Sequence, residues 1–149
     1  MDAQAFTREV ATRLGCDERR ADALTFAVFQ QLHARLTSEE AADVAAQLPT
    51  PLKRLWEQHD RAGRPVERME RAEFVGRVRR FAALPDDGEA ERAVRAVFGV
   101  LQRLLGSPSG KEGEAWDVFS QLPKGLKQLW LEASAPSASS PGRARPSTS

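Results

Sequence analysis

The chain has 149 residues, and its 41% hydrophobic and 29% charged residues are typical of a globular protein. Its 22 basic and 21 acidic residues leave a net charge of +1, which excludes an overall field that would attract nucleic acid or anionic lipid. Cys16 is the only cysteine, so an intrachain disulfide and a cysteine-based zinc site are excluded. The start has no apolar signal-peptide core, and no stretch approaches the ~20 apolar residues that span a bilayer. We therefore expect a soluble, cytoplasmic protein without membrane contact.

An internal repeat organises the chain. Residues 40–56 read EAADVAAQLPTPLKRLW and residues 114–130 read EAWDVFSQLPKGLKQLW, and 11 of these 17 positions are identical. This repeat predicts a duplicated helical domain over residues 1–132. A Ser/Pro/Ala-rich segment follows it and predicts a disordered tail. The predicted parts are copy one (2–58), a connector (59–69), copy two (70–132) and the tail (133–149).

Copy one predicts four helices, because its apolar residues recur at spacings of three and four. Their apolar faces are, in chain order, Phe6, Val10 and Leu14; Leu24, Val28, Leu32 and Leu36; Ala41, Val44 and Leu48; and Leu52, Leu55 and Trp56. Asp2 and Asp17 are expected to cap the first two helices, and Gly15 to end the first. Thr37 and Glu40 are expected to form a capping box before the third helix, in which each side chain accepts a hydrogen bond from the other residue's backbone N–H.

Copy two repeats this scheme. Its predicted inward-facing residues are Phe74, Val78 and Phe81; Val94, Val97, Phe98, Leu101 and Leu105; Trp116, Val118, Phe119 and Leu122; and Leu126, Leu129 and Trp130. Asp86 and Asp87, after Pro85, predict the turn and cap before its long helix. In copy one, Pro49 ends the third helix and Pro51 opens the fourth. No segment alternates apolar and polar residues between turns, so no strand is predicted.

These patterns predict an all-α protein in which two tandem copies of a small unit, about four helices each, pack into one bundle-like domain. A unit of about 55 residues is marginally stable alone. Its apolar faces are also wider than its own helices cover, so we expect the two copies to share a core. A pseudo-twofold arrangement is the simplest interpretation, and two separate lobes joined by a flexible connector remain the alternative.

The doubled pattern also resembles a known family. The motif E-A-x-D-V-x-x-Q-L-P-x-x-L-K-x-L-W occurs twice, and each copy is preceded by F-x3-V and by a long Ala/Arg/Leu helix. This is similar to the bacterial family catalogued as domain of unknown function, family 2267, over about residues 4–131. The resemblance implies a small helical bacterial protein with a duplicated layout, and no assigned activity or cofactor. The GSPSGKEG insertion of copy two departs from the family pattern.

No motif in the sequence carries recognisable chemistry. His33 and His59 have no partner at metal-ligand spacing, and we expect both to be solvated or incidentally packed. Cys16 precedes a helix, which could stabilise a thiolate, but without a nucleophile motif a half-buried structural thiol is expected. We therefore predict no catalytic, cofactor-binding or metal-binding residue, no cofactor and no enzymatic activity.

Several polar residues recur in both copies although exposed positions are free to vary. One interpretation is a side-chain network that fixes the turn at QLP, in which Gln47 bonds open backbone groups near Pro49. The other is a paired partner-binding surface. We expect the repeated Trp56 and Trp130 to be buried at the end of the core of each copy. The alternative is that they are exposed and bind a partner. The candidate partner-binding residues are Glu40, Asp43, Gln47, Glu114, Asp117 and Gln121.

Basic residues gather in the middle of the chain. Residues 53–80 hold nine basic and five acidic residues, which could form a phosphate-binding face. A solvated face is the simpler interpretation, because glutamates are interleaved with the arginines. The candidate nucleic-acid-binding residues are Arg54, Arg61, Arg64, Arg68, Arg77, Arg79 and Arg80.

Taken together, the sequence favours a non-enzymatic protein-interaction, regulatory or scaffold module whose partner is another protein. Nucleic-acid binding through the arginine-rich middle is the alternative. An enzyme with an unrecognised site is the third hypothesis.

Overall fold

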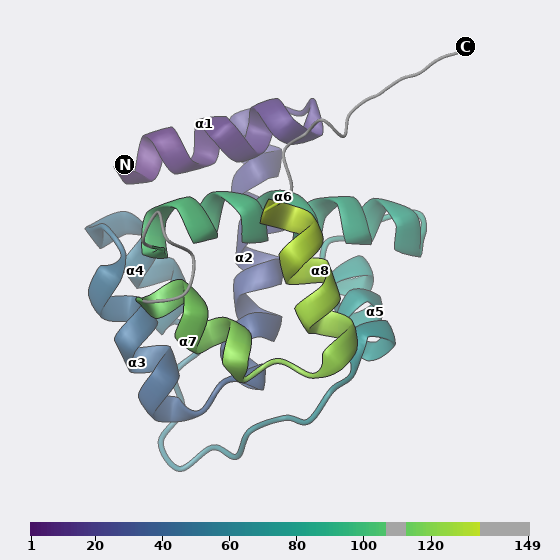
Figure 1. Ribbon diagram of the computed structural model, residues 1–149. Coiled ribbons are helices and arrows are strands. Elements are labelled where there is room, and N and C mark those ends of the chain that lie inside the picture. Colours follow the sequence, from purple (N-terminus) through teal and green to yellow (C-terminus); the bar gives the residue numbers. More distant parts are fainter. Residues whose placement is uncertain (107–112, 135–149) are drawn as a thin grey trace.

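The computed structural model describes residues 1–106 and 113–134, and within these ranges it contains eight helices and no strand (Figure 1). The helices of copy one are α1 (Ala3–Leu14), α2 (Glu18–Arg35), α3 (Ser38–Gln47) and α4 (Thr50–Glu57). The helices of copy two are α5 (Arg71–Phe81), α6 (Asp87–Leu105), α7 (Glu114–Ser120) and α8 (Lys124–Ser134). The predicted all-α class with four helices in each copy is confirmed. Of the predicted tail, residues 133 and 134 belong to α8, and residues 135–149 lie outside the described part.

Local caps place the helix ends where the sequence predicts them. Asp2 Oδ1 accepts a hydrogen bond from the Ala5 N–H at 2.8 Å, and Asp17 Oδ1 accepts one from the Arg20 N–H at 2.8 Å. Gly15 ends α1 with φ 67°, a left-handed conformation that favours glycine. Each carboxylate satisfies an amide that the first helical turn leaves unbonded, so these boundaries follow from local sequence.

The two copies pack against each other through matching helices. α2 contacts α6, and α3 contacts α7. α1 of copy one lies on α6 of copy two, and α5 of copy two lies on α2 of copy one. Figure 1 shows α1 running along α6, and α3 beside α7. A pseudo-twofold axis between the copies produces this exchange of contacts, so the copies form one body rather than two lobes.

One hydrophobic core spans both copies. Each copy contributes a chain of three aromatic rings in contact, Phe6–Phe29–Trp56 in copy one and Phe74–Phe98–Trp130 in copy two. Successive ring centroids are 6.0 and 5.2 Å apart in copy one, and 5.9 and 4.9 Å apart in copy two. Both tryptophans are buried, which confirms their expected place in the core. The similar centroid distances show that both copies keep the same order of ring contacts, although the angle between the phenylalanine and tryptophan rings is 81° in copy one and 57° in copy two.

Two aromatic residues predicted to face inward are exposed instead. Phe81 is 62% exposed, because the buried face of α5 continues from Val78 to Ala82 and bypasses Phe81. Trp116 is 42% exposed, because Val118 takes the inward position on α7. The inward-facing prediction is therefore wrong at these two positions.

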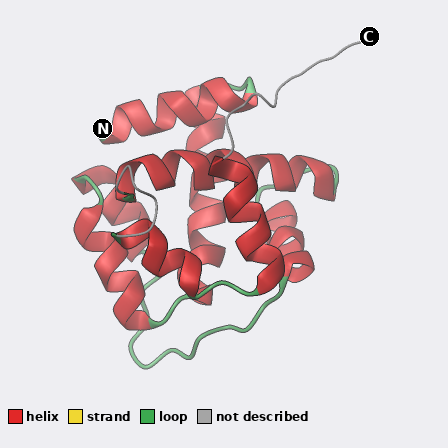
Figure 2. Cartoon of the chain, in the orientation of Figure 1, coloured by secondary structure: helices red, strands yellow, loops and turns green. Residues whose placement is uncertain are grey.

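The connector is docked against copy one rather than flexible. It runs as a loop from α4 to α5 (Figure 2). The Glu67 N–H donates to the Ala34 carbonyl at 2.9 Å. The Arg64 guanidinium donates to the carbonyls of His33 and Leu36 at 2.7 and 2.9 Å. The His33 carbonyl also accepts from the Leu36 N–H at 3.2 Å, so Arg64 reinforces the C-terminal end of α2.

We predict that Phe98→Ala lowers the free energy of unfolding by about 3–5 kcal/mol, because Phe98 is fully buried between two other rings. Phe81→Ala is the matched control, and we expect a change within about 0.5 kcal/mol because Phe81 is exposed. Urea unfolding followed by circular dichroism measures both. Similar losses in the two variants would contradict the shared core described above.

Candidate functional site: the contact between α3 and α7

Repeated acidic residues from both copies meet where α3 packs against α7. Glu40 and Asp43 lie one turn apart on α3, and Glu114 and Asp117 hold the matching positions on α7. Carboxylate oxygens of Glu40, Asp43 and Glu114 lie within 4.8 Å of one another. We call these four residues the acidic cluster. The helices that hold it lie side by side in Figure 1.

The acidic cluster is buried on one side and open on the other. Glu40 is only 6% exposed, and Glu114 is half-buried, whereas Asp43 and Asp117 are exposed. Oε2 of Glu40 and Oε2 of Glu114 are both buried, and neither has a hydrogen-bond partner among the described residues. A buried carboxylate without a partner is costly, so this arrangement requires a compensating proton or cation.

The electrostatics of the cluster favour a proton on Glu40. Burial is the largest cause that raises the pKa of Glu40, to about 9. The adjacent carboxyl group of Glu114 and the negative charges of Asp117 and Asp43 also contribute to this raised pKa. At neutral pH and without a cation, the Glu40 carboxyl group therefore carries a proton.

The predicted capping box at Thr37 forms only by half. The Glu40 N–H donates to the Thr37 hydroxyl at 3.1 Å, as expected. The Thr37 N–H, however, donates to Oε1 of Gln121 at 3.1 Å and not to the Glu40 carboxylate. The reciprocal bond is therefore a wrong prediction, because a side chain from the other copy supplies the acceptor. Glu40 is left free to turn toward Glu114.

Gln47 does not close the QLP turn as one interpretation of the repeat expects. Its side chain is exposed and makes no hydrogen bond within the described ranges. The turn is closed instead by the Leu48 N–H, which donates to the Ala45 carbonyl at 3.1 Å. Of the six candidate partner-binding residues, the structure joins four in the acidic cluster and places Gln121 at the contact between copies. Gln47 stands apart from these contacts.

An aromatic pair lies on α7 next to the acidic cluster, with Trp116 exposed and Phe119 half-buried against the core. Trp116 stacks on Phe119 with ring centroids 5.2 Å apart and an interplanar angle of 29°. Lys127 Nζ lies over the Phe119 ring, 5.4 Å from its centroid. Sequence reasoning missed this pair as a surface feature. Comparison of the two copies could have identified it, because copy one has alanines, Ala42 and Ala45, at the matching positions.

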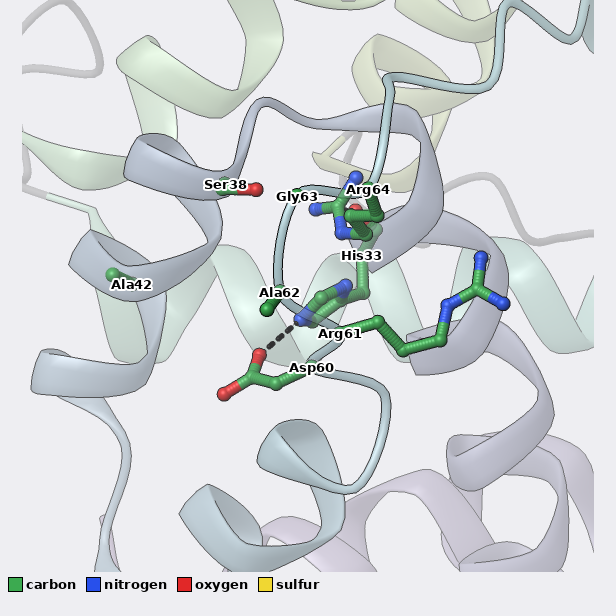
Figure 3. Close-up of a pocket in the computed structure, with 8 residues that line it drawn as sticks. All are labelled: His33, Ser38, Ala42, Asp60, Arg61, Ala62, Gly63 and Arg64. Carbon is green, nitrogen blue, oxygen red and sulfur yellow. Dashed lines mark hydrogen bonds and ion pairs between the residues drawn. The ribbon is translucent and has the colours of Figure 1, made fainter.

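A second candidate site is a pocket of about 280 Å³ between α2, α3 and the connector. Figure 3 shows His33 at the back of this pocket, with its Nε2 bonded to Asp60 Oδ1 at 2.6 Å. Ser38, Arg61 and Arg64 also line it. The Arg64 guanidinium is already bound to backbone carbonyls, so it is a structural brace rather than a free cation.

The histidines are more deeply placed than the sequence suggests. His33 is 2% exposed and packs against the rings of Trp56 and His59, at centroid distances of 5.1 and 5.9 Å. Burial is the main cause that lowers the pKa of His33, and it lowers the pKa of His59 to about 4. Both rings are therefore neutral at physiological pH, and His33 is packed rather than solvated, which is one of the two expected alternatives.

The candidate nucleic-acid arginines do not form one free basic face. Arg77 pairs with Glu67 and Glu73 at 2.7 and 2.5 Å, and Arg79 pairs with Asp87 at 2.9 Å. The others are spread over α4 (Arg54), the connector (Arg61, Arg64 and Arg68) and the end of α5 (Arg80). Nucleic-acid binding stays a prediction, but Arg64, Arg77 and Arg79 already bind carbonyl or carboxylate groups of the protein, so fewer arginines could bind phosphate than the sequence indicates.

Cys16 is half-buried, as predicted. Burial is the largest cause that raises the pKa of its thiol, and the charge of Asp17 raises it further. This favours the protonated thiol, so the structural interpretation of Cys16 fits better than a reactive thiolate.

Comparisons with known proteins place the chain in one family. The family model described as "Uncharacterized conserved protein (DUF2267)" matches residues 3–129, and a second match covers residues 73–148. The chain belongs to this family. A search of curated proteins found no match. Among the described residues, no helix has the length and apolar character needed to cross a membrane.

We predict that Glu40→Gln makes the protein more stable in metal-free alkaline buffer. The pKa of Glu40 is raised in the folded state, so its contribution to stability is complete below about pH 4.5 and falls as the pH rises toward about 9. The glutamine mimics the protonated acid and removes this loss. We expect the variant to exceed the wild type by roughly 1–3 kcal/mol at about pH 8, and by less at about pH 6.

Urea unfolding at several pH values measures this difference. Glu39→Gln is the matched control, because Glu39 is an exposed neighbour on the same helix. A stability difference between Glu40→Gln and the wild type that does not change with pH would contradict the prediction.

Proposed function

We propose that this member of a family of uncharacterized conserved proteins is a non-enzymatic interaction module, which binds another protein through the exposed face of α7. The single observation that carries the proposal is the stacked Trp116–Phe119 pair beside the exposed carboxylate of Asp117. Tryptophan is among the residues that most often dominate protein–protein binding energy.

The chemistry of this face suits a partner segment that carries Lys or Arg beside an apolar side chain. Aromatic ring faces attract cations, and Lys127 already occupies such a position over Phe119. Asp43 and Asp117 add negative charge next to the rings. A basic partner would gain both contacts at once, and its apolar side chain would cover the exposed indole.

The asymmetry of the repeat supports a role in binding. Trp116 and Phe119 replace the Ala42 and Ala45 of copy one, although the Asp-Val pair between these positions is identical in both copies. An exposed tryptophan gains nothing for the fold, whereas the corresponding alanine of copy one is exposed at no cost. The substitution therefore fits a one-sided contact made by copy two.

The test is capture of partners from a lysate of the cell that makes the protein, with the full chain immobilised. We expect at least one captured protein to be lost with Trp116→Ala, to be kept with Phe81→Ala, and to be released as the salt concentration rises. Phe81→Ala is the matched control because it also removes an exposed aromatic ring. Identical captured proteins for the wild type and Trp116→Ala would refute the proposal.

With a purified partner, Trp116→Ala should weaken binding at least about tenfold. Intrinsic fluorescence gives an independent readout, because Trp116 is exposed while Trp56 and Trp130 are buried. Partner binding should shift the emission to shorter wavelength in the wild type and leave it unchanged in Trp116→Ala.

A further inference from the structure

We propose that the acidic cluster of Glu40, Asp43, Glu114 and Asp117 is a binding site for a hard divalent cation, and that Ca²⁺ fits it best. This goes beyond the proposed partner binding and does not depend on it. The sequence predicts no metal site, because that expectation rests on histidine and cysteine spacing. The donors here are carboxylates that come together only in the folded chain.

The oxygen positions match the size of Ca²⁺. Ca²⁺ binds oxygen ligands at roughly 2.3–2.6 Å, so ligands on opposite sides of the ion lie roughly 4.6–5.2 Å apart, and neighbouring ligands lie closer. One oxygen each from Glu40, Asp43 and Glu114 already lies within 4.8 Å of the other two. An ion can therefore enter with side-chain adjustment alone.

The donor set selects the class of ion. All four side chains offer oxygen, and hard cations such as Ca²⁺, Mg²⁺ and Mn²⁺ prefer carboxylate oxygen. Mg²⁺ requires ligands at roughly 2.0–2.1 Å in nearly octahedral geometry, so opposite ligands must approach to about 4.2 Å. We therefore expect Ca²⁺ to bind more tightly than Mg²⁺.

Glu40 supplies a second observation, separate from the mere presence of acidic residues. It is 6% exposed, its Oε2 is inaccessible, and no donor within the described ranges satisfies that atom. Its carboxylate is directed at Asp43 and Glu114. A buried carboxylate costs several kcal/mol unless it is protonated, paired or bound to a cation.

Within the described ranges, no Lys, Arg or His side chain forms an ion pair with the acidic cluster. Other glutamates pair with arginines, for example Glu91 with Arg71 at 3.0 Å and Glu67 with Arg77 at 2.7 Å. The negative charge is thus left for a proton or for an external ion.

The position of the cluster gives the ion a structural consequence. Glu40 and Asp43 belong to copy one, and Glu114 and Asp117 belong to copy two. A bound cation would link the two copies across their pseudo-twofold contact.

The experiment titrates the full chain, stripped with a chelator, with Ca²⁺, Mg²⁺ and Mn²⁺ separately in isothermal calorimetry near pH 7.5. We expect one Ca²⁺ ion per chain, weaker Mg²⁺ binding, and a rise in melting temperature that grows with ion concentration. Mn²⁺ should give a broadened electron paramagnetic resonance spectrum when bound, which provides a readout independent of stability.

Three variants decide whether the acidic cluster holds the ion. Glu114→Gln and Asp43→Asn should each weaken Ca²⁺ binding at least about tenfold. Asp43 is exposed, so its variant keeps the fold even if a buried substitution does not. The matched control, Glu39→Gln, carries the same charge change on the same helix and should bind like the wild type.

The proposal is overturned if none of the three ions binds to the chelator-stripped chain. It is also overturned if Asp43→Asn and Glu114→Gln bind as the wild type does, or if Glu39→Gln weakens binding equally. The last result would mean diffuse attraction by surface charge. None of these three outcomes tests partner capture through Trp116, so this site and the proposed function can fail separately.

Discussion

Mutual burial of two equivalent apolar surfaces is the constraint on which this structure depends. Each copy of the repeat contains the same chain of three aromatic rings. The long helix of each copy is also apolar on a side that the other helices of that copy do not cover. α2 and α6 bury these sides against each other, while α1 and α5 each cross to the other copy. Because the contacts are exchanged in pairs, neither copy completes its core alone.

This packing explains why like charges meet. A pseudo-twofold axis brings each element near it against its own counterpart, so α3 faces α7. Residues that the repeat duplicates on the facing sides of these helices can then approach each other. Glu40 and Glu114 are such a pair, and the raised pKa of Glu40 follows from that approach and from burial. The repulsion is tolerated because the hydrophobic core holds the helices together, and it leaves a cluster suited to a proton or a cation.

The departures from symmetry are as informative as the symmetry. Copy two carries the Trp116–Phe119 pair where copy one has alanines, which makes one face of α7 suited to a partner. In copy one, the connector braces the end of α2 and closes the pocket beside His33. Duplication thus supplied the core, while the separate changes in each copy produced two different surfaces.

The sequence by itself determined the helices, their caps and the duplication, because these depend on residues close together in the chain. Asp2, Asp17 and Gly15 act within a single turn, and the apolar spacing needs only helical geometry. The tertiary structure alone decided which residues meet across the copies. The Thr37 N–H donates to the side chain of Gln121 and not to that of Glu40. Phe81 lies outside the core, and Glu40 lies beside Glu114. These outcomes depend on how separate helices are placed in space, and the local pattern of a single chain carries no information about that placement.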